Sequence, residues 1–396
     1  MNMNEQMKES EESILHTYNR FPVVFEKGQG CYLYDSEGKE YLDFAAGIAV
    51  NALGYHYPGY DEALKSQIDK LMHISNLYYN EPIIDAGARL VQASHMEKAF
   101  FTNSGTEAIE GALKAAKKYA YERDGHADHE IIAMNHSFHG RSIGALSVTG
   151  NAHYREPFEP LMGGVKFADF NDLESVKAQI TDKTCAIITE VVQGEGGIYP
   201  AKKEFLEGLR QICDEKDIML IFDEIQCGMG RTGHYFAWQA YGVQPDIMTS
   251  AKALGCGVPV GAFVLGEKAA KASLEPGDHG TTYGGNPFVC AAVSKVFDIY
   301  ENDKIIEHVQ EMTPYLEQKL DEIVAKHECA ATRRGMGFMQ GIVIQGRPVG
   351  EVVKAALTKG LLVISAGSDV LRIVPPLVTT KEHIDKMAAI LDECME

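Results

Sequence analysis

Short apolar runs recur through the middle of the chain, and stretches with the helical spacing of apolar residues separate them. The runs cover residues 99–102, 130–134, 185–189, 218–222, 246–249 and 261–265. Strands that are apolar throughout and alternate with helices are typical of a mostly parallel sheet with helices on both faces. We therefore expect an α/β fold in which ligands bind beyond the carboxyl ends of these strands.

The two ends of the chain have different patterns. Residues 23–44 alternate in the manner of short strands. A long helical pattern over residues 287–327 leads into an α+β tail. A chain of 396 residues can bury two separate cores. We therefore expect a large domain over residues 58–290 and a smaller α+β domain formed by residues 1–57 together with residues 291–396.

The composition excludes several classes of protein. The formal net charge of -19 argues against nucleic acid or an anionic membrane as a partner. No apolar stretch reaches the roughly 20 residues that a membrane-spanning helix needs, and the polar, acidic residues 1–12 are unlike a signal or transit peptide. The eight cysteines form no CxxC pair, so we expect no metal site and reduced thiols in the cytoplasm.

Two polar residues stand close to the ends of apolar runs. Asp223 directly follows residues 218–222, and Lys252 comes shortly after residues 246–249 and before a glycine-rich turn. Pyridoxal phosphate chemistry needs an amine that forms a Schiff base and a carboxylate that keeps the pyridine nitrogen protonated. Most lysines lie on the surface, but the apolar surroundings of Lys252 predict a desolvated amine with a lowered pKa. The two residues together predict a pyridoxal phosphate enzyme.

The segment after residues 99–102 fits a phosphate. Ser104, Gly105 and Thr106 stand at the start of a long predicted helix. Free amides and the helix dipole at such a start favour an anion, and the hydroxyl groups add donors. The alternative is a capping box, in which Ser104 and Glu107 only satisfy the first amides of the helix.

Further candidates follow other strands. Phe138 could stack on a pyridine ring, and Arg141 could bind a carboxylate through two nitrogens; the alternative is a buried phenylalanine and a solvated arginine. Glu190 and Glu195 could form an acid pair as in glycosidases, or orient positive groups around a cofactor. Gln226 could reach the phenolic oxygen of the cofactor.

Two glycine-rich segments remain. Residues 228–233 match GxGxxG, but acidic residues precede the segment and no capped helix start follows it. A dinucleotide-binding fingerprint requires the opposite arrangement, so we expect a loop near the active site instead. In residues 279–287, Thr281 and Thr282 could donate to a phosphate or a carboxylate.

The order of these segments resembles the class III aminotransferases of fold type I. The shared motifs are Ser-Gly-Thr-Glu-Ala, Phe-His-Gly-Arg, Glu-x-x-Gln-Gly-Glu-Gly-Gly, Asp-Glu-Ile-Gln, Ser-Ala-Lys-Ala-Leu and His-Gly-Thr-Thr-Tyr-Gly-Gly-Asn-Pro. The resemblance runs from about Thr17 to the end of the chain. It implies a pyridoxal phosphate-dependent homodimer with shared active sites that acts on small amino acids and keto acids.

The resemblance also implies a role for each matching residue. Lys252 holds the cofactor and moves a proton, Asp223 pairs with the pyridine nitrogen, and Gln226 contacts the phenolic oxygen. Phe138 stacks on the ring, and Thr282 of the other subunit joins the phosphate site. The cofactor-binding set is Ser104, Gly105, Thr106, Phe138, Glu190, Asp223, Gln226, Lys252 and Thr282.

The substrate-binding residues implied by the resemblance are Arg141, Thr281, Glu195 and Arg372. Arg141 holds the α-carboxylate of glutamate or 2-oxoglutarate, and Thr281 lies near the substrate. Glu195 and Arg372 resemble a gate. Paired, they neutralise each other while the amine donor reacts; opened, Arg372 takes the side-chain carboxylate of glutamate.

Three stretches are most similar to family members that act on N-acetylornithine: residues 47–54, residues 223–233, and residues 364–367 with 371–376. Ornithine-specific members carry a tyrosine where residues 46–48 read Ala-Gly-Ile. The loss of that hydroxyl removes a partner for a free α-amine and leaves room for an acylated one. The resemblance thus implies transfer of the δ-amino group of N-acetylornithine to 2-oxoglutarate, in arginine biosynthesis.

Other functions stay open. Related enzymes act on N-succinyl-diaminopimelate, N-succinylornithine, ornithine or 4-aminobutyrate. A racemase, decarboxylase or aminomutase would use the same cofactor without consuming a keto acid. A non-catalytic binding protein could share the fold, although the presence of Lys252, Asp223 and Arg141 argues against it.

Overall fold

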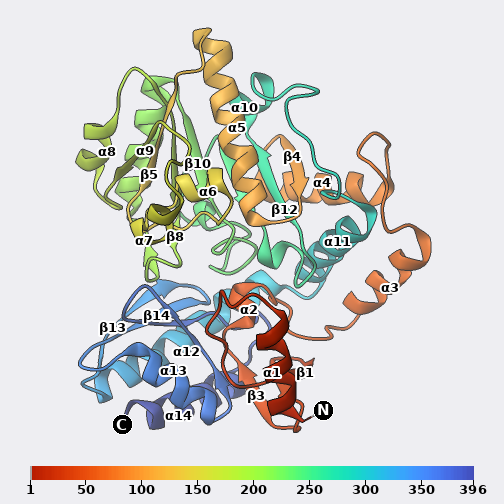
Figure 1. Ribbon diagram of the computed structural model, residues 1–396, viewed down its shortest axis with the longest axis vertical. Helices are drawn as coiled ribbons and strands as arrows, with labels where there is room; N and C mark the ends of the chain where they lie inside the picture. Colours follow the sequence, from red (N-terminus) through yellow and green to blue (C-terminus); the bar gives the residue numbers. More distant parts are fainter. Residues whose placement is uncertain (1) are drawn as a thin grey trace.

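The computed structural model describes residues 2–396 and consists of two parts, one above the other in Figure 1. The larger part is built on a seven-stranded sheet in the order β4-β12-β11-β10-β7-β5-β6. Its strands are β4 (Lys98–Thr102), β5 (Glu130–Met134), β6 (Val165–Ala168), β7 (Thr184–Glu190), β10 (Met219–Asp223), β11 (Ile247–Ser250) and β12 (Gly261–Leu265). Neighbouring strands from β11 to β6 run parallel, whereas β12 runs antiparallel to β11 and β4. The mostly parallel sheet predicted from the sequence is confirmed.

One strand of this sheet, β6, lies outside the predicted apolar runs. Lys166 stands between Val165 and Phe167, and only Ala168 is fully buried. The strand forms the edge of the sheet beyond β5. Because an edge strand needs less apolar surface than a central one, its sequence gives a weak signal.

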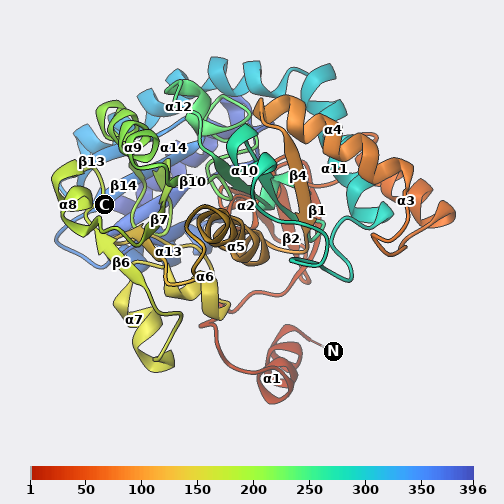
Figure 2. The ribbon, with the colours of Figure 1, turned by 90° about the horizontal axis from the view of Figure 1, so that it is seen from above.

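Alternate side chains of the central strands enter two separate cores. Ile221 of β10 belongs to the same cluster as Ala112 of α5 (Gly105–Asp124). Its neighbour Leu220 belongs to the other cluster, together with Leu209 of α9 (Lys203–Lys216). Figure 2 shows α5 and α9 on opposite faces of the sheet. Both faces are covered, which explains why these strands are apolar throughout.

The smaller part contains two four-stranded sheets. One has the order β1-β2-β3-β15 and the other β13-β14-β17-β16. The strands are β1 (Phe25–Gln29), β2 (Tyr32–Asp35), β3 (Glu40–Asp43), β13 (Ala330–Met336), β14 (Met339–Ile344), β15 (Leu361–Leu362), β16 (Ile364–Ala366) and β17 (Val370–Ile373). Strand β15 pairs in parallel with β3, with Leu361 opposite Leu42, so one sheet combines strands from early and late segments of the chain. The domain boundaries given above stay a prediction.

The long helical stretch expected over residues 287–327 is present and contains one break. It forms α11 (Pro287–Asn302) and α12 (Ile305–Lys326). The break falls at Lys304, whose φ of 53° lies in the left-handed region that a right-handed helix cannot contain. Helices α11 and α12 lead from the larger part into the smaller one (Figure 1).

The remaining elements are short or lie at the periphery. They are α1 (Met3–Ser13), α2 (Ala46–Ala49), α3 (Tyr60–Lys70), α4 (Glu81–Ser94), α6 (Ile143–Ser147), α7 (Ala152–Arg155), η1 (Glu156–Phe158), α8 (Leu173–Gln179), β8 (Val192–Gln193), β9 (Tyr199–Pro200), η2 (Ala237–Ala240), η3 (Lys252–Leu254), α10 (Glu267–Lys271), α13 (Val349–Thr358) and α14 (Lys381–Met395). Helix α1 stands apart from the rest of the molecule in Figure 2. Across residues 2–396, none of the helices combines the length and the apolar character that crossing a membrane requires.

Candidate active site

A cavity of about 400 Å³ lies at the carboxyl ends of the central strands. Strand pairing brings its polar residues together, because Asp223 stands opposite Glu190 on one side and Thr249 on the other. Nine of the residues proposed from the sequence line this cavity: Ser104, Gly105, Thr106, Phe138, Arg141, Glu190, Asp223, Gln226 and Lys252. The structure thus collects in one place side chains that are far apart in the sequence.

Lys252 begins η3, directly after the loop that follows β11. Its φ of 48° is left-handed, which is unusual for a residue with a side chain and marks a constrained position. Burial lowers the pKa of Lys252 to about 8, and the carboxylate of Glu195 limits this decrease. A lysine in this state releases its proton near neutral pH, as an amine nucleophile must.

Asp223 is buried at the end of β10 and shares a hydrogen bond with His139. Nδ1 of His139 lies 2.7 Å from Oδ2 of Asp223. The other carboxylate oxygen accepts from the amide of Ile225 and the hydroxyl of Thr249. Burial by itself lowers the pKa of His139, but the hydrogen bond and the negative charge of Asp223 raise it above the ordinary value. The imidazole therefore donates to Asp223 from Nδ1.

The sequence pattern indicates no role for His139, although this residue lies inside the Phe-His-Gly-Arg motif. A histidine between an aromatic residue and a glycine has no pattern that marks it as a partner of a distant carboxylate. Its Nε2 is buried and has no hydrogen-bond partner among residues 2–396. Only the order of the strands, which places β5 and β10 on either side of β7, brings it to Asp223.

Glu190 holds the backbone around the cavity. Its carboxylate accepts from the amide of Phe138 at 3.3 Å and from the amide of Gly194 at 3.1 Å. Burial raises the pKa of Glu190 to about 7. Glu195 instead lies against Arg372. The two glutamates have different partners, which argues against the glycosidase-like acid pair.

The start of α5 forms one end of the cavity. Ser104 caps the helix by accepting from the amide of Glu107, whereas the carboxylate of Glu107 accepts from the amide of Asn103 at 2.6 Å. Half of the capping box considered from the sequence is therefore present, and its reciprocal bond goes to Asn103 instead of Ser104. The first-turn amides at Gly105 and Thr106 have no partner within the helix and can bind an anion.

Gly140 packs closely against the start of α5. A Cβ on Gly140 would lie 2.4 Å from Oγ1 of Thr106, and its φ of 137° also disfavours a side chain. The Thr106 hydroxyl in turn lies 2.7 Å from the hydroxyl of Ser142. This close approach fixes the Thr106 hydroxyl at the edge of the cavity.

Glu195, Arg372 and Gln226 form a connected group beside the cavity. Nη2 of Arg372 lies 3.2 Å from Oε2 of Glu195, and Nη1 contacts Oε1 of the same carboxylate. Nη1 also donates to Oε1 of Gln226 at 3.1 Å. Burial tends to raise the pKa of Glu195, but the guanidinium of Arg372 lowers it below the ordinary value. The contact expected for a closed gate is present, and the role as a gate stays a prediction.

Arg141 lies over two aromatic rings at the mouth of the cavity. Its guanidinium carbon is 3.9 Å from the centre of the Tyr154 ring and 5.4 Å from that of Phe138. Stacking of this kind orients an arginine and leaves its edge free for a carboxylate. The placement suits the predicted role.

Thr281 and Thr282 are not among the residues that line the cavity of a single chain. The hydroxyl of Thr281 accepts from Asn103 and from the amide of Gly284. Thr282 is exposed. The structure of one chain therefore does not bring them to the cofactor end, and their roles stay predictions that require a second chain.

The loop over residues 228–233 is buried and does not open an α-helix. The next helical element is the short 3-10 helix η2. This geometry agrees with the rejection of a dinucleotide-binding fingerprint, in which the glycines lead into an α-helix.

One group of possible metal ligands lies far from the cavity, at the end of α5. It consists of Asp124, His126 and His129. The carboxylate of Asp124 already binds the guanidinium of Arg123 through two hydrogen bonds. Its only carboxylate is therefore already paired with a cation, and the absence of a metal site stays an expectation from the sequence.

Comparison with known proteins decides the family. The family model described as aminotransferase class-III matches residues 14–395. The chain belongs to the class-III aminotransferases. It is 47% identical over 388 residues to the acetylornithine aminotransferase of Clostridium acetobutylicum, covering 98% of this chain and 100% of that protein. It is 44% identical over 383 residues to the succinylornithine transaminase of Yersinia pseudotuberculosis, covering 94% and 92%.

The structural comparison agrees with this family. The ornithine aminotransferase of Toxoplasma gondii, whose structure has PLP at partial occupancy in the active site, superposes with a TM-score of 0.95. The two chains are 28% identical, and the match covers 100% of this chain and 94% of that one. The fold type I architecture and the dependence on pyridoxal phosphate, both expected from the sequence, are confirmed.

The cavity of this class-III aminotransferase fits pyridoxal phosphate. It offers an amine at Lys252, a buried carboxylate at Asp223 and an aromatic ring at Phe138. The start of α5 offers free amides for the phosphate. The space that Gly140 leaves empty keeps the Thr106 hydroxyl accessible there. The amine suits the aldehyde of the cofactor, the carboxylate suits its protonated ring nitrogen, and the amides suit its phosphate.

Proposed function

We propose that this chain transfers the δ-amino group of N-acetylornithine to 2-oxoglutarate, a step of arginine biosynthesis that gives N-acetylglutamate 5-semialdehyde and glutamate. The contact between Glu195 and Arg372, beside the cavity that holds Lys252, carries the proposal. The buried Arg372 can bind the side-chain carboxylate of a dicarboxylate substrate such as 2-oxoglutarate. When the other substrate, which has no such carboxylate, is bound, Glu195 can neutralise the arginine instead. The relatives named acetylornithine aminotransferase support the choice of amine.

The cofactor chemistry depends on groups that lie in the cavity. Bound pyridoxal phosphate supplies an aldehyde that reacts with amines and a ring that accepts electrons. Lys252, with its pKa lowered to about 8, can both take and release a proton at Nζ. Asp223 stabilises a positive charge on the ring nitrogen, and His139 holds the Asp223 carboxylate in place. Phe138, which lines the same cavity, would limit the access of water to a ring bound there.

The acyl group requires a wall without a competing polar group. Residues Gly47 and Ile48 of α2 have left-handed backbone angles, and Val50, two residues after Ile48, lines the cavity. None of these side chains carries a hydroxyl or a charge that could bind a free α-amine. This supports an acylated donor over ornithine, and N-succinylornithine is the second candidate because a succinylornithine transaminase is among the similar proteins.

We further propose that the enzyme is a homodimer. Segment 71–84 lies against the loop before α11, since Asn76 donates to the carbonyl of Gly284. This surface exposes a group of large apolar side chains: Leu71, Met72, Leu77, Tyr78, Tyr79, Ile84 and Tyr283. Monomers rarely expose so many neighbouring apolar side chains. A second chain on this surface would bury them and would carry the exposed Thr282 toward its partner's cavity.

The oligomeric state has a direct test. Light scattering of the purified protein should give twice the mass of the chain, and Tyr79→Asp should shift the mass toward the monomer. A wild-type protein that remains monomeric at micromolar concentration would contradict the homodimer.

For the place in the cell we propose the cytoplasm, because all eight cysteines are free thiols. Recovery of the protein from a secreted or periplasmic fraction of its host would contradict that location.

The proposed reaction is tested by following glutamate. Pure protein with pyridoxal phosphate should form glutamate from N-acetylornithine and 2-oxoglutarate, with equal consumption of both substrates. A racemase or a decarboxylase would convert the amine without consuming the keto acid. Absence of glutamate would eliminate the proposed reaction. Lys252→Ala serves as the control, because it should abolish both the turnover and the visible absorbance of the lysine-bound cofactor.

A further inference from the structure

Arg231, in the loop over residues 228–233, is an arginine buried without a carboxylate. Its exposed fraction is 1%. Nε and Nη2 have no hydrogen-bond partner within the part of the chain that the structure describes. Burial lowers its pKa to about 10. An unpaired guanidinium in the interior is costly, so its retention calls for a geometric reason.

The hydrogen bonds of Arg231 provide that reason. Nη1 contacts the carbonyl oxygen of Pro375 and, at 3.4 Å, that of Phe338. Pro375 follows the end of β17, the strand that carries Arg372, and Phe338 directly precedes β14. Strands β14 and β17 are paired, with Gly341 opposite Arg372. A single guanidinium thus binds two backbone carbonyls. One lies just after β17, which carries Arg372, and the other lies just before β14, which pairs with β17.

The other end of this connection leads back to the active site. The loop of Arg231 begins shortly after Gln226, which accepts a hydrogen bond from Arg372. Its backbone is tied to the same hairpin, since the carbonyl of Arg231 accepts from the amide of Phe338 at 2.8 Å. The chain from Gln226 to Arg231, and that from Pro375 back to Arg372, therefore form a closed ring of contacts.

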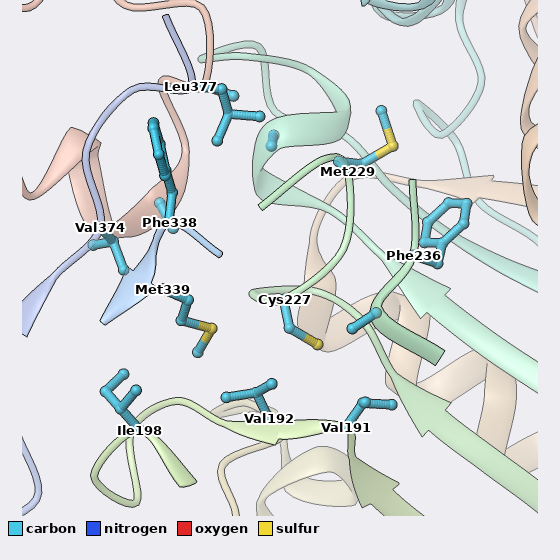
Figure 3. Packing of buried hydrophobic residues seen from close by; sticks show 14 of the residues in the cluster. Val191, Val192, Ile198, Cys227, Met229, Phe236, Phe338, Met339, Val374 and Leu377 are labelled. Carbon is cyan, nitrogen blue, oxygen red and sulfur yellow. The ribbon is translucent and has the colours of Figure 1, made fainter. Parts of the chain in front are cut away.

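Apolar packing closes the space around this ring. Figure 3 shows Cys227, which precedes the loop, and Met229 of the loop in one cluster with Phe338, Val374 and Leu377 from the smaller part. The fit is tight, because a Cβ on Gly230 would lie 2.8 Å from Cδ1 of Leu377. The loop and the strand that carries Arg372 cannot shift independently while this packing and the Arg231 hydrogen bonds persist.

We propose that Arg231 is a positioning residue for the dicarboxylate substrate, acting through Arg372. It fixes the backbone on which Arg372 stands, so that this guanidinium can exchange Glu195 for the side-chain carboxylate of 2-oxoglutarate or glutamate. The proposal rests on the proposed function for the identity of that substrate. Nη1 stands at the far end of the long arginine side chain, and this one atom contacts both carbonyls.

The test compares Arg231→Lys and Arg231→Met with the control Thr232→Val. Thr232 is the next residue, is buried, and its hydroxyl has no partner among residues 2–396. In both Arg231 variants the KM for 2-oxoglutarate should rise at least about tenfold, a loss of ~1.4 kcal/mol, while the KM for N-acetylornithine stays within about twofold. The control should leave both values unchanged.

A binding measurement separates this proposal from the proposed function. Glutarate, an unreactive five-carbon dicarboxylate, should bind the cofactor-loaded Arg231 variants at least about tenfold more weakly than the wild type in calorimetry. This holds whichever amine the enzyme uses. An equal loss for both substrates, unchanged glutarate binding in Arg231→Lys, or the same effect in Thr232→Val would overturn the positioning role. If Arg231→Met does not fold, Arg231→Lys alone decides the matter.

Discussion

Nδ1 of His139 lies 2.7 Å from Oδ2 of Asp223, and both side chains are buried. The histidine is the sole side chain that forms an ion pair with this carboxylate among residues 2–396. It therefore offsets part of the cost of burying the charge before any cofactor binds. The pairing also holds the Asp223 carboxylate from one side, while Ile225 and Thr249 hold its other oxygen.

Asp223 should depend on this histidine for its position. In His139→Leu we expect kcat to fall about tenfold, or ~1.4 kcal/mol in the activation barrier, because Asp223 keeps only the bonds from Ile225 and Thr249. Steady-state kinetics at saturating substrate checks this. A variant with unchanged kcat would show that Asp223 needs no such support.

The pairing of His139 also predicts how stability depends on pH. Its pKa is raised by folding, so the folded state binds more protons than the unfolded state above the ordinary histidine pKa of about 6.5. The stabilisation is complete below that pH and is lost as the pH rises through the raised value. The difference in unfolding free energy between wild type and His139→Asn should therefore be larger at pH 6 than at pH 9. Denaturant unfolding of the cofactor-free proteins measures it, and an opposite trend would contradict the assignment.

Gly140 should be required for phosphate binding. A Cβ in Gly140→Ala would displace the Thr106 hydroxyl, which lies 2.4 Å from its position, and would occupy an unfavourable backbone region. We expect pyridoxal phosphate to bind at least about tenfold more weakly, a loss of ~1.4 kcal/mol. Equilibrium dialysis provides the dissociation constant. Gly163→Ala is the matched control, since no atom lies within 4 Å of its added Cβ, and equal affinities of the two variants would speak against a tight site.

Lys252 should react at a lower pH than other lysines. Its pKa is lowered to about 8 by burial, whereas an exposed lysine has a pKa of about 10.4. In the cofactor-free protein the rate of covalent capture of an aldehyde at Lys252 should rise with pH and level off above about 8. Glu195→Gln should move the midpoint lower, because the Glu195 carboxylate raises this pKa. A midpoint near that of an exposed lysine would contradict the buried setting.

Glu195 should matter for the amine donor, and Arg372 for the keto acid. Glu195→Gln leaves the buried guanidinium of Arg372 without a counter-charge, so the half-reaction with N-acetylornithine should slow at least about tenfold. In the double variant with Arg372→Gln this half-reaction should recover, while that with 2-oxoglutarate should not. Single-turnover absorbance changes of the cofactor follow each half-reaction separately. Strictly additive effects in this cycle would show that the two residues act independently.

Much of the fold could be predicted from the sequence because its strands are buried on both faces. Continuous apolar runs give a strong local signal, and the residues after them mark the site at the strand ends. Asp223 and Lys252 follow this rule, since β10 and β11 are neighbours in the sheet. The edge strand β6 does not follow it, because its exposed side tolerates Lys166.

The partners of the site residues could not be predicted in the same way. His139 follows β5, and Asp223 ends β10. Both strands are neighbours of β7 in the sheet, and this order brings the two side chains together. Local spacing in the sequence contains no information on strand order. Arg231 is a similar case. A lone arginine in a glycine-rich loop indicates a solvated side chain, and only the packing of the smaller part against that loop buries it.

The central claim is that this class-III aminotransferase acts on an acylated ornithine. The most direct measurement compares kcat/KM for N-acetylornithine, N-succinylornithine and ornithine, with 2-oxoglutarate as the acceptor. We predict the highest value for N-acetylornithine and a value at least about tenfold lower for ornithine, whose free α-amine finds no hydroxyl or charge on Gly47, Ile48 or Val50. A kcat/KM for ornithine equal to or above that for both acylated amines would contradict the account.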